Sequence, residues 1–262
     1  MEKLFSLKGK NILVTGGAGY LGTAMCEALA SYGATLFIAS RNEDGCKQLA
    51  EHLANEYGVL CKGASIDVSS EESIHRCVKN ILESHGRIDV MVNNAAFSVN
   101  GYFDDLTETM WKMGIDGTVN SVFRMCSAVL PHMERQGYGN IINISSMYGM
   151  VSPDPDSYRG EVRFNNPACY GAGKAAVLQL TRYIAGYYGQ KGIRCNSISP
   201  GPFPSKEVQQ TRWFVDGLAN KTMLKRIGQP KDLAGVIVLL ASDASQYITG
   251  TNICVDGGWT AW

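Results

Sequence analysis

The chain has 262 residues, of which 45% are hydrophobic and 18% charged, and this composition favours one large folded domain with a substantial core. Lys and Arg together number 24, as do Asp and Glu, so the zero net charge indicates neither a nucleic-acid-binding surface nor a polybasic membrane patch. The eight cysteines are scattered without a CxxC pair and the four histidines are isolated, so we expect reduced thiols and no metal site. The opening MEKLFSLKGK lacks an apolar core of signal-peptide length, and we expect a cytoplasmic protein.

Apolar runs typical of β-strands alternate with helical segments along the whole chain. Helices are expected between the strands, including a long one near 107–133, and the strands are expected at 11–16, 34–40, 59–68, 88–96, 139–146, 192–201 and 251–258. Continuous aliphatic strands separated by helices indicate a parallel sheet that is covered on both faces. The predicted fold class is therefore α/β, a Rossmann-like, doubly wound, seven-stranded parallel sheet in a single domain over 1–262.

A glycine-rich turn, TGGAGYLG at 15–22, joins the first expected strand to the first expected helix. Glycines let a backbone turn sharply and approach a pyrophosphate, whose negative charge is favoured at a helix N-terminus. This context is the one that a dinucleotide-binding turn requires. We therefore expect a nicotinamide dinucleotide to bind at Gly16, Gly19, Tyr20 and Leu21.

The end of the second expected strand reads Ser40-Arg41-Asn42. A carboxylate at this place would accept a hydrogen bond from the ribose 2′-hydroxyl of NAD(H), whereas an arginine would bind the 2′-phosphate of NADP(H). Arg41 therefore favours NADP(H), with NAD(H) as the alternative.

A tyrosine and a lysine, Tyr170 and Lys174, lie four residues apart in the helical segment NNPACYGAGKAAVLQLTRYIA. Residues i and i+4 share one face of a helix, so an ammonium beside the phenol would lower the pKa of the phenol and suit it to general acid–base catalysis. Two surface side chains that share a face by chance would give the same pattern. The choice between these interpretations depends on the rest of the sequence.

The segment before this helix, 147–168, breaks the alternation of strands and helices with three prolines and five charged residues. A loop of this length inside a compact domain is usually functional, although a solvated surface loop is the alternative. We expect a polar lid in which Arg159 or Arg163 faces a hydroxyl-rich or carboxylate-bearing substrate, because an arginine fork suits a carboxylate. The other charged residues of this loop are Asp154, Asp156 and Glu161.

Taken together and in this order, the motifs resemble the short-chain dehydrogenase/reductase superfamily over essentially the whole chain. The motifs that carry the resemblance are the glycine turn, IDV (66–68), NNAA (93–96), NISS (143–146), YGAGK (170–174), PGPFPS (200–205) and ITGTNICVDGG (248–258). The resemblance implies that Asp67 and Val68 contact the adenine, that Asn94 and Ala95 border the cofactor, and that a last group covers the nicotinamide: Pro200, Gly201, Phe203 and Ser205.

The resemblance also implies the catalytic roles. Tyr170 would donate a proton to the substrate carbonyl oxygen while the nicotinamide delivers hydride, and Ser146 would hydrogen-bond the same oxygen. Lys174 would lower the tyrosine pKa and hold the nicotinamide ribose.

Three features depart from the family pattern of the compact, single-domain branch. Tyr20 stands where that branch usually has glycine, so the glycines follow the spacing of the longer, epimerase-like branch. Thr118 aligns with the asparagine that usually completes a proton relay to the lysine, and Asn120 lies on another face of the helix. Ser146 and Tyr170 are 24 residues apart, about ten more than is usual, because of the 147–168 loop.

The sequence therefore predicts an NAD(P)(H)-dependent oxidoreductase that interconverts a carbonyl group and a secondary alcohol, with a small polar substrate such as a sugar acid or polyol. The alternatives are an epimerase or dehydratase acting on a nucleotide-linked sugar and a non-catalytic dinucleotide sensor. The family further implies a homo-oligomer, a tetramer or a dimer.

Overall fold

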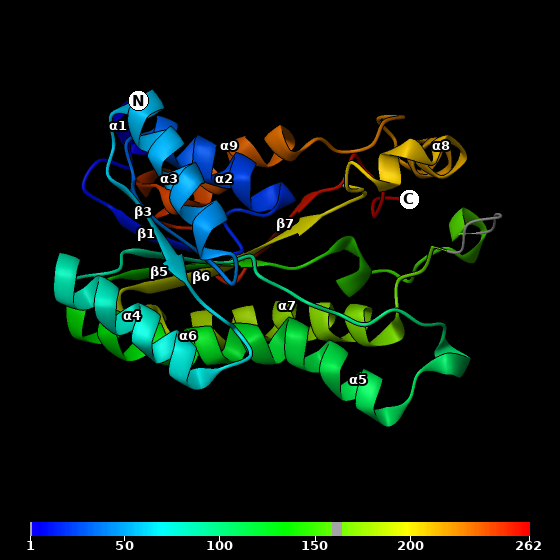
Figure 1. Ribbon diagram of the computed structural model, residues 1–262, viewed down its shortest axis with the longest axis horizontal. Helices are drawn as coiled ribbons and strands as arrows, with labels where there is room; N and C mark the ends of the chain where they lie inside the picture. Colours follow the sequence, from blue (N-terminus) through cyan, green and yellow to red (C-terminus); the bar gives the residue numbers. More distant parts are fainter. Residues whose placement is uncertain (1, 159–163) are drawn as a thin grey trace.

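The structure, a computed structural model, describes residues 2–158 and 164–262 (Figure 1). Its centre is a parallel seven-stranded sheet with the strand order β3-β2-β1-β4-β5-β6-β7. The predicted α/β, doubly wound fold class is confirmed. The strands are β1 (Asn11–Thr15), β2 (Thr35–Ser40), β3 (Cys61–Ser65), β4 (Val90–Asn93), β5 (Gly139–Ile144), β6 (Ile193–Pro200) and β7 (Asn252–Val255).

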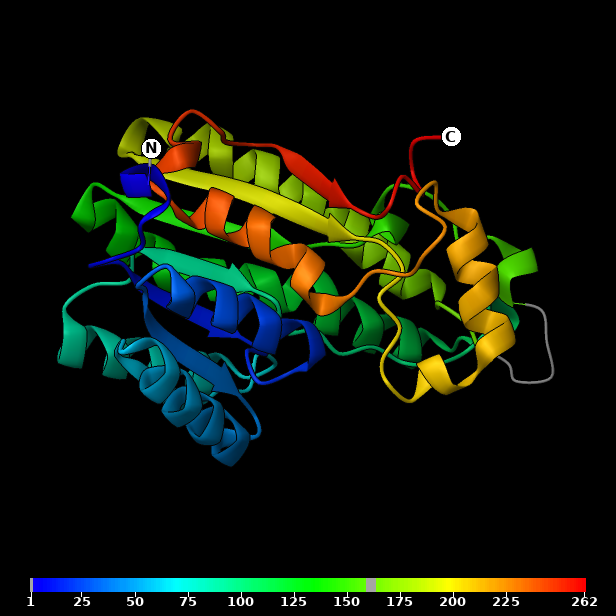
Figure 2. The same ribbon diagram turned by 90° about the horizontal axis from the view of Figure 1, so that it is seen from above.

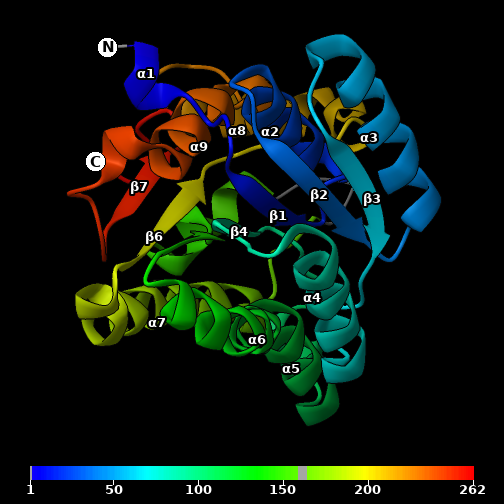
Figure 3. The same ribbon diagram turned by 90° about the vertical axis from the view of Figure 1, so that its left-hand side faces the viewer.

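Helices cover both faces of the sheet, as the end view in Figure 3 shows. One layer contains α2, α3 and α9, and the other contains α4, α6 and α7. The helices are α1 (Glu2–Phe5), α2 (Tyr20–Ser31), α3 (Glu43–Tyr57), α4 (Glu71–His85), α5 (Glu108–Ile115), α6 (Ser121–Gln136), α7 (Ala168–Tyr188), α8 (Arg212–Lys221) and α9 (Ala234–Ala241).

Alternate side chains of each strand enter the two cores. In β1, Ile12 and Val14 pack in the core under α2 and α9, whereas Leu13 packs in the core under α4 and α6. Since successive residues of a strand point to opposite faces, a sheet covered on both sides needs aliphatic residues throughout. This is why the strands read as continuous apolar runs in the sequence.

The strand order reverses between β1 and β4, whose connections leave to opposite faces of the sheet. A crevice forms at such a switch point, outside the carboxyl ends of the strands. Two strands at this crevice are shorter than predicted: β3 ends at Ser65 and β4 ends at Asn93. The residues that follow them leave the sheet at the crevice.

The long helix expected near 107–133 is divided into α5 and α6 by a π-helical turn, η2 (Asp116–Asn120). Two glycines let this region approach its neighbours: a Cβ on Gly117 would lie 2.0 Å from Phe97 O, and one on Gly114 would lie 2.3 Å from Cys169 Sγ. The turn therefore packs directly against α7 and against the segment after β4. π-turns within helices are often found at functional sites.

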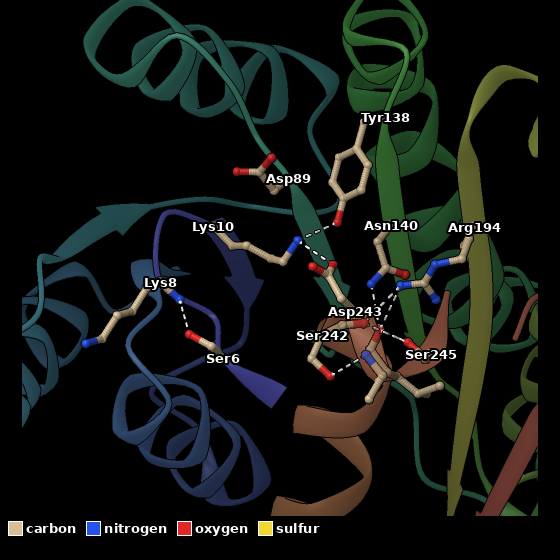
Figure 4. Close-up of polar contacts among 12 residues, drawn as sticks. Ser6, Lys8, Lys10, Asp89, Tyr138, Asn140, Arg194, Ser242, Asp243 and Ser245 are labelled. Carbon is tan, nitrogen blue, oxygen red and sulfur yellow. Dashed lines mark hydrogen bonds and ion pairs between the residues drawn. The ribbon is translucent and has the colours of Figure 1, made fainter. Parts of the chain in front are cut away.

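Figure 4 shows a polar cluster at the amino ends of the strands, opposite the crevice. Arg194 donates to Ile248 O, Leu240 O and Ser242 O at 3.2, 3.3 and 3.5 Å, and Asn140 Nδ2 donates to Leu240 O at 2.7 Å. A cation at the carboxyl end of a helix satisfies its free carbonyls and its dipole. The cluster therefore fixes the end of α9 to β5 and β6.

The 147–168 loop contains two short 3₁₀ turns, η3 (Met147–Gly149) and η4 (Pro155–Tyr158), and lies beside α8 at the carboxyl end of the sheet (Figure 2). The ring of Phe164 stacks on that of Phe214 with a centroid distance of 4.2 Å, and the Tyr158 ring is 5.5 Å from the same phenylalanine. Asp154 forms an ion pair with Lys221 of α8. The described part of the loop thus meets α8 mainly through aromatic rings, and Arg159, Glu161 and Arg163 lie outside the described residues.

Candidate active site

The glycine turn has the geometry that a closely approaching ligand requires. Gly16 has a φ of 63°, in the left-handed region. A Cβ on Gly22 would lie 2.1 Å from Gly16 O, and one on Gly19 would lie 3.1 Å from the same oxygen. The first turn of α2 therefore packs on the strand end so tightly that only glycine fits at position 22.

The N-terminus of α2 differs from those of α3 and α4. In α3 and α4, Asn42 and Ser70 cap the backbone with their side chains, and acidic residues occupy the first turn. In α2 the N-cap is Gly19, without a side-chain cap, and the first turn has no acidic residue. The free backbone N–H groups of a helix N-terminus favour an anion, so this turn fits the pyrophosphate of a dinucleotide.

A cleft of about 350 Å³ opens beside this turn. Nine of the predicted cofactor-binding residues line it: Gly16, Gly19, Tyr20, Leu21, Arg41, Asp67, Val68, Asn94 and Ala95. Sequence reasoning missed five others that line the same cleft, namely Gly22, Ser40, Ile66, Ala96 and Phe97. Most of these adjoin a predicted residue in the chain, so each motif could have been extended by one position.

Polar contacts between β1 and β4 hold the two walls of the cleft together. Asn94 Nδ2 donates to Gly16 O at 2.9 Å and to Thr15 O at 3.1 Å. In return, the backbone N–H groups of Asn94 and Ala95 donate to Thr15 Oγ1 at 3.2 and 3.1 Å. Asn94 and Ala95 therefore shape the glycine turn from the neighbouring strand.

Two charged groups lie at the outer part of the cleft. The pKa of Asp67 is lowered, chiefly because Ser69 Oγ and Ser69 N donate to its Oδ1 at 2.7 and 2.9 Å. Arg41 is exposed and forms no ion pair within 2–158 and 164–262. Its guanidinium is therefore available to an anionic ligand.

The predicted catalytic residues Ser146, Tyr170 and Lys174 come together at the carboxyl end of β5. Ser146 lies close enough to Tyr170 to lower the pKa of the phenol, and its Oγ accepts from Tyr148 N at 3.1 Å. Lys174 is 4% exposed, and its Nζ lies 5.7 Å from the centroid of the Tyr170 ring and donates to Ile144 O at 2.7 Å. The structure therefore brings the three side chains close together at this strand end.

The pKa values differ from the sequence expectation. Burial raises the pKa of Tyr170, and the nearby Ser146 opposes this rise only in part. Burial also lowers the pKa of Lys174 to about 8. The net shift of the Tyr170 pKa is therefore upward and not downward as expected, because desolvation of the phenolate dominates. The Lys174 ammonium bonds to a backbone carbonyl, and its effect on the phenol stays a prediction.

Thr118 lies in the π-turn and faces α7, where a Cβ on Gly173 would lie 1.8 Å from its Oγ1. It is 1% exposed, and its hydroxyl donates to Gly114 O at 2.7 Å. The side chain is thus adjacent to the helix that carries Tyr170 and Lys174, but its proton is engaged within its own helix.

The predicted nicotinamide-covering group lies beyond β6. Pro200 ends the strand, and Gly201 packs so closely that a Cβ would lie 2.5 Å from Asp256 Cα. Phe203 lies against Gly228 in a separate cleft, and Ser205 precedes the 3₁₀ turn η6 (Val208–Gln210). None of these four residues lines the cleft beside the glycine turn.

One contact nevertheless joins this segment to the glycine turn. Gln209 Nε2 donates to the Tyr20 hydroxyl at 2.9 Å and to Pro204 O at 2.9 Å. Tyr20, which replaces the usual glycine, thus connects the start of α2 with the segment before α8.

Comparison with known proteins places this geometry in a family. A family model described as enoyl-(acyl carrier protein) reductase matches residues 17–260. The chain is 33% identical to the 3-oxoacyl-[acyl-carrier-protein] reductase FabG of Chlamydia muridarum, covering 96% of this chain and 98% of the relative. It is also 33% identical to the 5-keto-D-gluconate 5-reductase of Escherichia coli K12, with 98% of each chain covered.

Among solved structures, a gluconate 5-dehydrogenase from Burkholderia cenocepacia in complex with NADP and tartrate superposes with a TM-score of 0.89 at 30% identity, covering 100% of this chain and 99% of that one. The chain therefore belongs to the short-chain dehydrogenase/reductase superfamily. It is an NAD(P)-dependent oxidoreductase that interconverts a carbonyl group and a secondary alcohol. No helix within the described ranges has the length and apolar character needed to cross a bilayer.

Proposed function

We propose that this oxidoreductase uses NADP(H) and acts on a small polar substrate such as a sugar acid or polyol. The observation that carries the proposal is the meeting of Tyr170, Ser146 and Lys174 at the carboxyl end of β5, next to a glycine turn suited to a dinucleotide. Nicotinamide, when bound, supplies or accepts the hydride. The protein's own residues bind and orient the substrate and the cofactor, and they transfer the proton.

The proton step falls to Tyr170. Its phenol stays protonated at neutral pH, because burial raises its pKa, and it can therefore donate to a carbonyl oxygen. Ser146 Oγ, which is close to Tyr170, would hold the same oxygen. The buried Lys174 ammonium would stabilise the phenolate that remains and bind the ribose of the cofactor.

Preference for NADP(H) is supported by Arg41, whose guanidinium lines the cleft without an ion pair among the described residues. We expect Arg41→Ala to weaken NADPH binding by about 1.5–3 kcal/mol, the worth of a hydrogen bond to a charged group, and to leave NADH binding almost unchanged. Fluorescence titration with both cofactors measures this, with Arg182→Ala on the exposed face of α7 as the control. Tighter binding of NADH than NADPH by the wild type would overturn the cofactor assignment.

The small polar substrate is supported by relatives named for keto-gluconate and gluconate chemistry. A spectrophotometric screen of sugar acids, polyols and simple ketones with NADP(H) and NAD(H) tests it. A much faster reaction with a steroid or a long acyl ketone would contradict the substrate class. Turnover of a nucleotide-linked sugar without net cofactor oxidation would favour the epimerase alternative, and cofactor binding without any turnover would favour the sensor.

The proposal extends to the whole chain acting as one cytoplasmic NAD(P)-binding domain that assembles with copies of itself. Exposed aromatic side chains on α6 and α7, Phe123, Tyr183 and Tyr187, support the assembly. Light scattering on the purified protein measures the oligomeric state, and a monomer at micromolar concentration would exclude it.

A further inference from the structure

A cleft of about 1000 Å³ lies between the described part of the 147–168 loop, the N-terminal part of α7 and the segment after β4. It adjoins the catalytic residues without including them, since Tyr148 follows Ser146 by two residues and Gly171 follows Tyr170. Its walls are largely apolar and include Phe103, Met150 and Pro153. The polar side chains among its lining residues are therefore few and decide which ligands it accepts.

Three of these polar side chains form a hydrogen-bonded chain. Asn166 Nδ2 donates to the Tyr158 hydroxyl at 2.8 Å, and the Tyr158 hydroxyl is hydrogen-bonded to that of Tyr148. Aromatic packing holds both rings: Tyr158 lies against Phe214, and Tyr148 lies edge-on to Trp259 with a centroid distance of 6.5 Å. Both tyrosines line the cleft, and this packing fixes the positions of their rings and hydroxyls.

The two tyrosine hydroxyls together have one more proton than their mutual hydrogen bond uses. Each tyrosine hydroxyl has one proton, and the bond between Tyr148 and Tyr158 uses only one of the two. Asn166 donates to Tyr158, which polarises that hydroxyl and favours it as the donor to Tyr148. The Tyr148 proton then remains, without a partner among the described residues.

The hydrogen-bonded tyrosines, Tyr148 and Tyr158, lie close to the predicted catalytic residues Tyr170 and Ser146. Burial is the main cause that raises the pKa values of both Tyr148 and Tyr158, and the neighbouring Tyr170 contributes to each rise. Both hydroxyls therefore keep their protons at physiological pH. The backbone N–H of Tyr148 also donates to Ser146 Oγ, so this residue adjoins the oxygen site directly.

We propose that the Tyr148 hydroxyl donates a hydrogen bond to an oxygen atom that the substrate carries beyond its reacting carbonyl, which makes Tyr148 a specificity-determining residue with Tyr158 and Asn166 as its positioning residues. This proposal rests on the proposed function and deepens it. A buried donor rejects a ligand that cannot accept its proton, so the cleft selects oxygenated substrates over hydrocarbon ones of the same shape.

Paired ketones test this proposal. Straight-chain methyl ketones with a terminal hydroxyl, of several chain lengths, are each compared with the ketone in which a methyl group replaces that hydroxyl. For the wild type we expect kcat/KM to favour the hydroxylated member of one pair by about 3- to 10-fold, the worth of one neutral hydrogen bond. Tyr148→Phe should abolish the preference and Tyr158→Phe should reduce it, while kcat/KM for the hydrocarbon ketone and the Kd of NADPH stay unchanged.

Tyr57→Phe, at the exposed end of α3, is the matched control and should keep the preference. An unchanged preference in Tyr148→Phe, or an equal loss for both members of a pair, would overturn the proposal, since the second result is that of a purely structural residue. If the wild type reduces none of the ketones, the proposed function is judged by the screen of sugar acids and polyols, and Tyr148 is judged by binding. The Kd values of the same pairs for the NADP-saturated protein then judge Tyr148, and equal values for wild type and Tyr148→Phe would refute its role.

Discussion

At the scale of single residues, the candidate site depends on one partly buried phenol. Burial raises the pKa of Tyr170, so the neutral form predominates at neutral pH. A neutral phenol suits carbonyl reduction, in which it gives up a proton, whereas oxidation of an alcohol needs the phenolate. We therefore expect the rate of alcohol oxidation to rise with pH as the phenolate forms.

Replacing the phenol tests its role directly. We expect Tyr170→Phe to lower kcat by about 10²-fold or more, because general acid catalysis is typically worth 10²–10⁴. The Kd of NADPH should change little, since the phenol contributes only a proton. Steady-state rates and cofactor titration measure both, with Tyr247→Phe, whose side chain is fully exposed, as the control. Near-normal turnover of Tyr170→Phe would remove the phenol from the mechanism.

The buried lysine predicts the pH dependence. Its pKa is lowered to about 8 by burial, so the ammonium is lost as the pH rises through 8, and we expect kcat/KM for reduction to fall there. Stability should move in the opposite direction. Between pH 8 and 10.5, the usual pKa of a lysine, the unfolded lysine binds more protons than the folded one, so this group raises the free energy of unfolding as the pH rises.

A pH–rate profile alongside urea unfolding at each pH separates these two effects. Loss of activity that tracks loss of stability would show that the enzyme merely unfolds. A rate that stays constant to pH 10 would show that the lysine charge is not needed.

At the scale of secondary-structure elements, the junction of β1 and α2 is held by a glycine contact. We expect Gly22→Ala to lower the free energy of cofactor binding or of unfolding by about 1–3 kcal/mol, as overpacking does. The reason is that its Cβ would overlap Gly16 O. Gly235→Ala in α9 is the matched control, since a Cβ there meets nothing within 4 Å. Calorimetric titration with NADPH and thermal unfolding of both variants make the comparison. Equal behaviour of the two would contradict the tight approach.

The 147–168 loop contacts α8 through an ion pair and through aromatic rings. The sequence predicted a charged lid, and the residues on which that hypothesis depended most, Arg159 and Arg163, lie outside the described residues. Asp154 binds Lys221 of α8 and accepts from Ser157 Oγ at 3.1 Å, so its charge serves the packing of the loop. The aromatic rings of the loop, which carry no charge, form its contact with α8 because they bury large apolar areas.

At the scale of the whole molecule, the two ends of the sheet have separate tasks. The carboxyl end holds the candidate site, and the amino end holds the cluster of Figure 4, in which Arg194 closes the end of α9. Residues of the amino-end cluster can therefore be replaced without changing a residue of the candidate site. Parallel sheets allow this division because all their strand carboxyl ends meet at one edge.

We expect Arg194→Met to lower the free energy of unfolding by about 2–3 kcal/mol, because the carbonyls of three residues lose a charged donor. Urea unfolding should show a lower midpoint with an unchanged m-value. KM for both cofactor and substrate should stay as in the wild type at low temperature. Arg182→Met, on the exposed face of α7, controls for the loss of a surface charge, and a change in KM alone would contradict the separation of the two ends.

The fold and much of the cofactor cleft could be predicted because both depend on local patterns. Aliphatic runs define buried parallel strands, and the TGGAGYLG turn forms where a strand meets a helix. Neither pattern depends on distant parts of the chain. Strand ends were predicted too long at β3 and β4, since apolar residues such as Ile66 leave the sheet to line the cleft. The catalytic roles of Ser146, Tyr170 and Lys174 remain predictions, although the structure brings their side chains together.

The sequence by itself therefore determined the order of strands and helices, the glycine turn and the Tyr170–Lys174 pair, because each arises from residues that are neighbours in the chain. Only the tertiary structure decided how the groups behave. Burial from several elements raises the pKa of Tyr170 and lowers that of Lys174, against the expectation from their spacing. The chain from Asn166 to Tyr148 likewise depends on distances that the loop sets in space, and desolvation and long-range contacts leave no signal in a local motif.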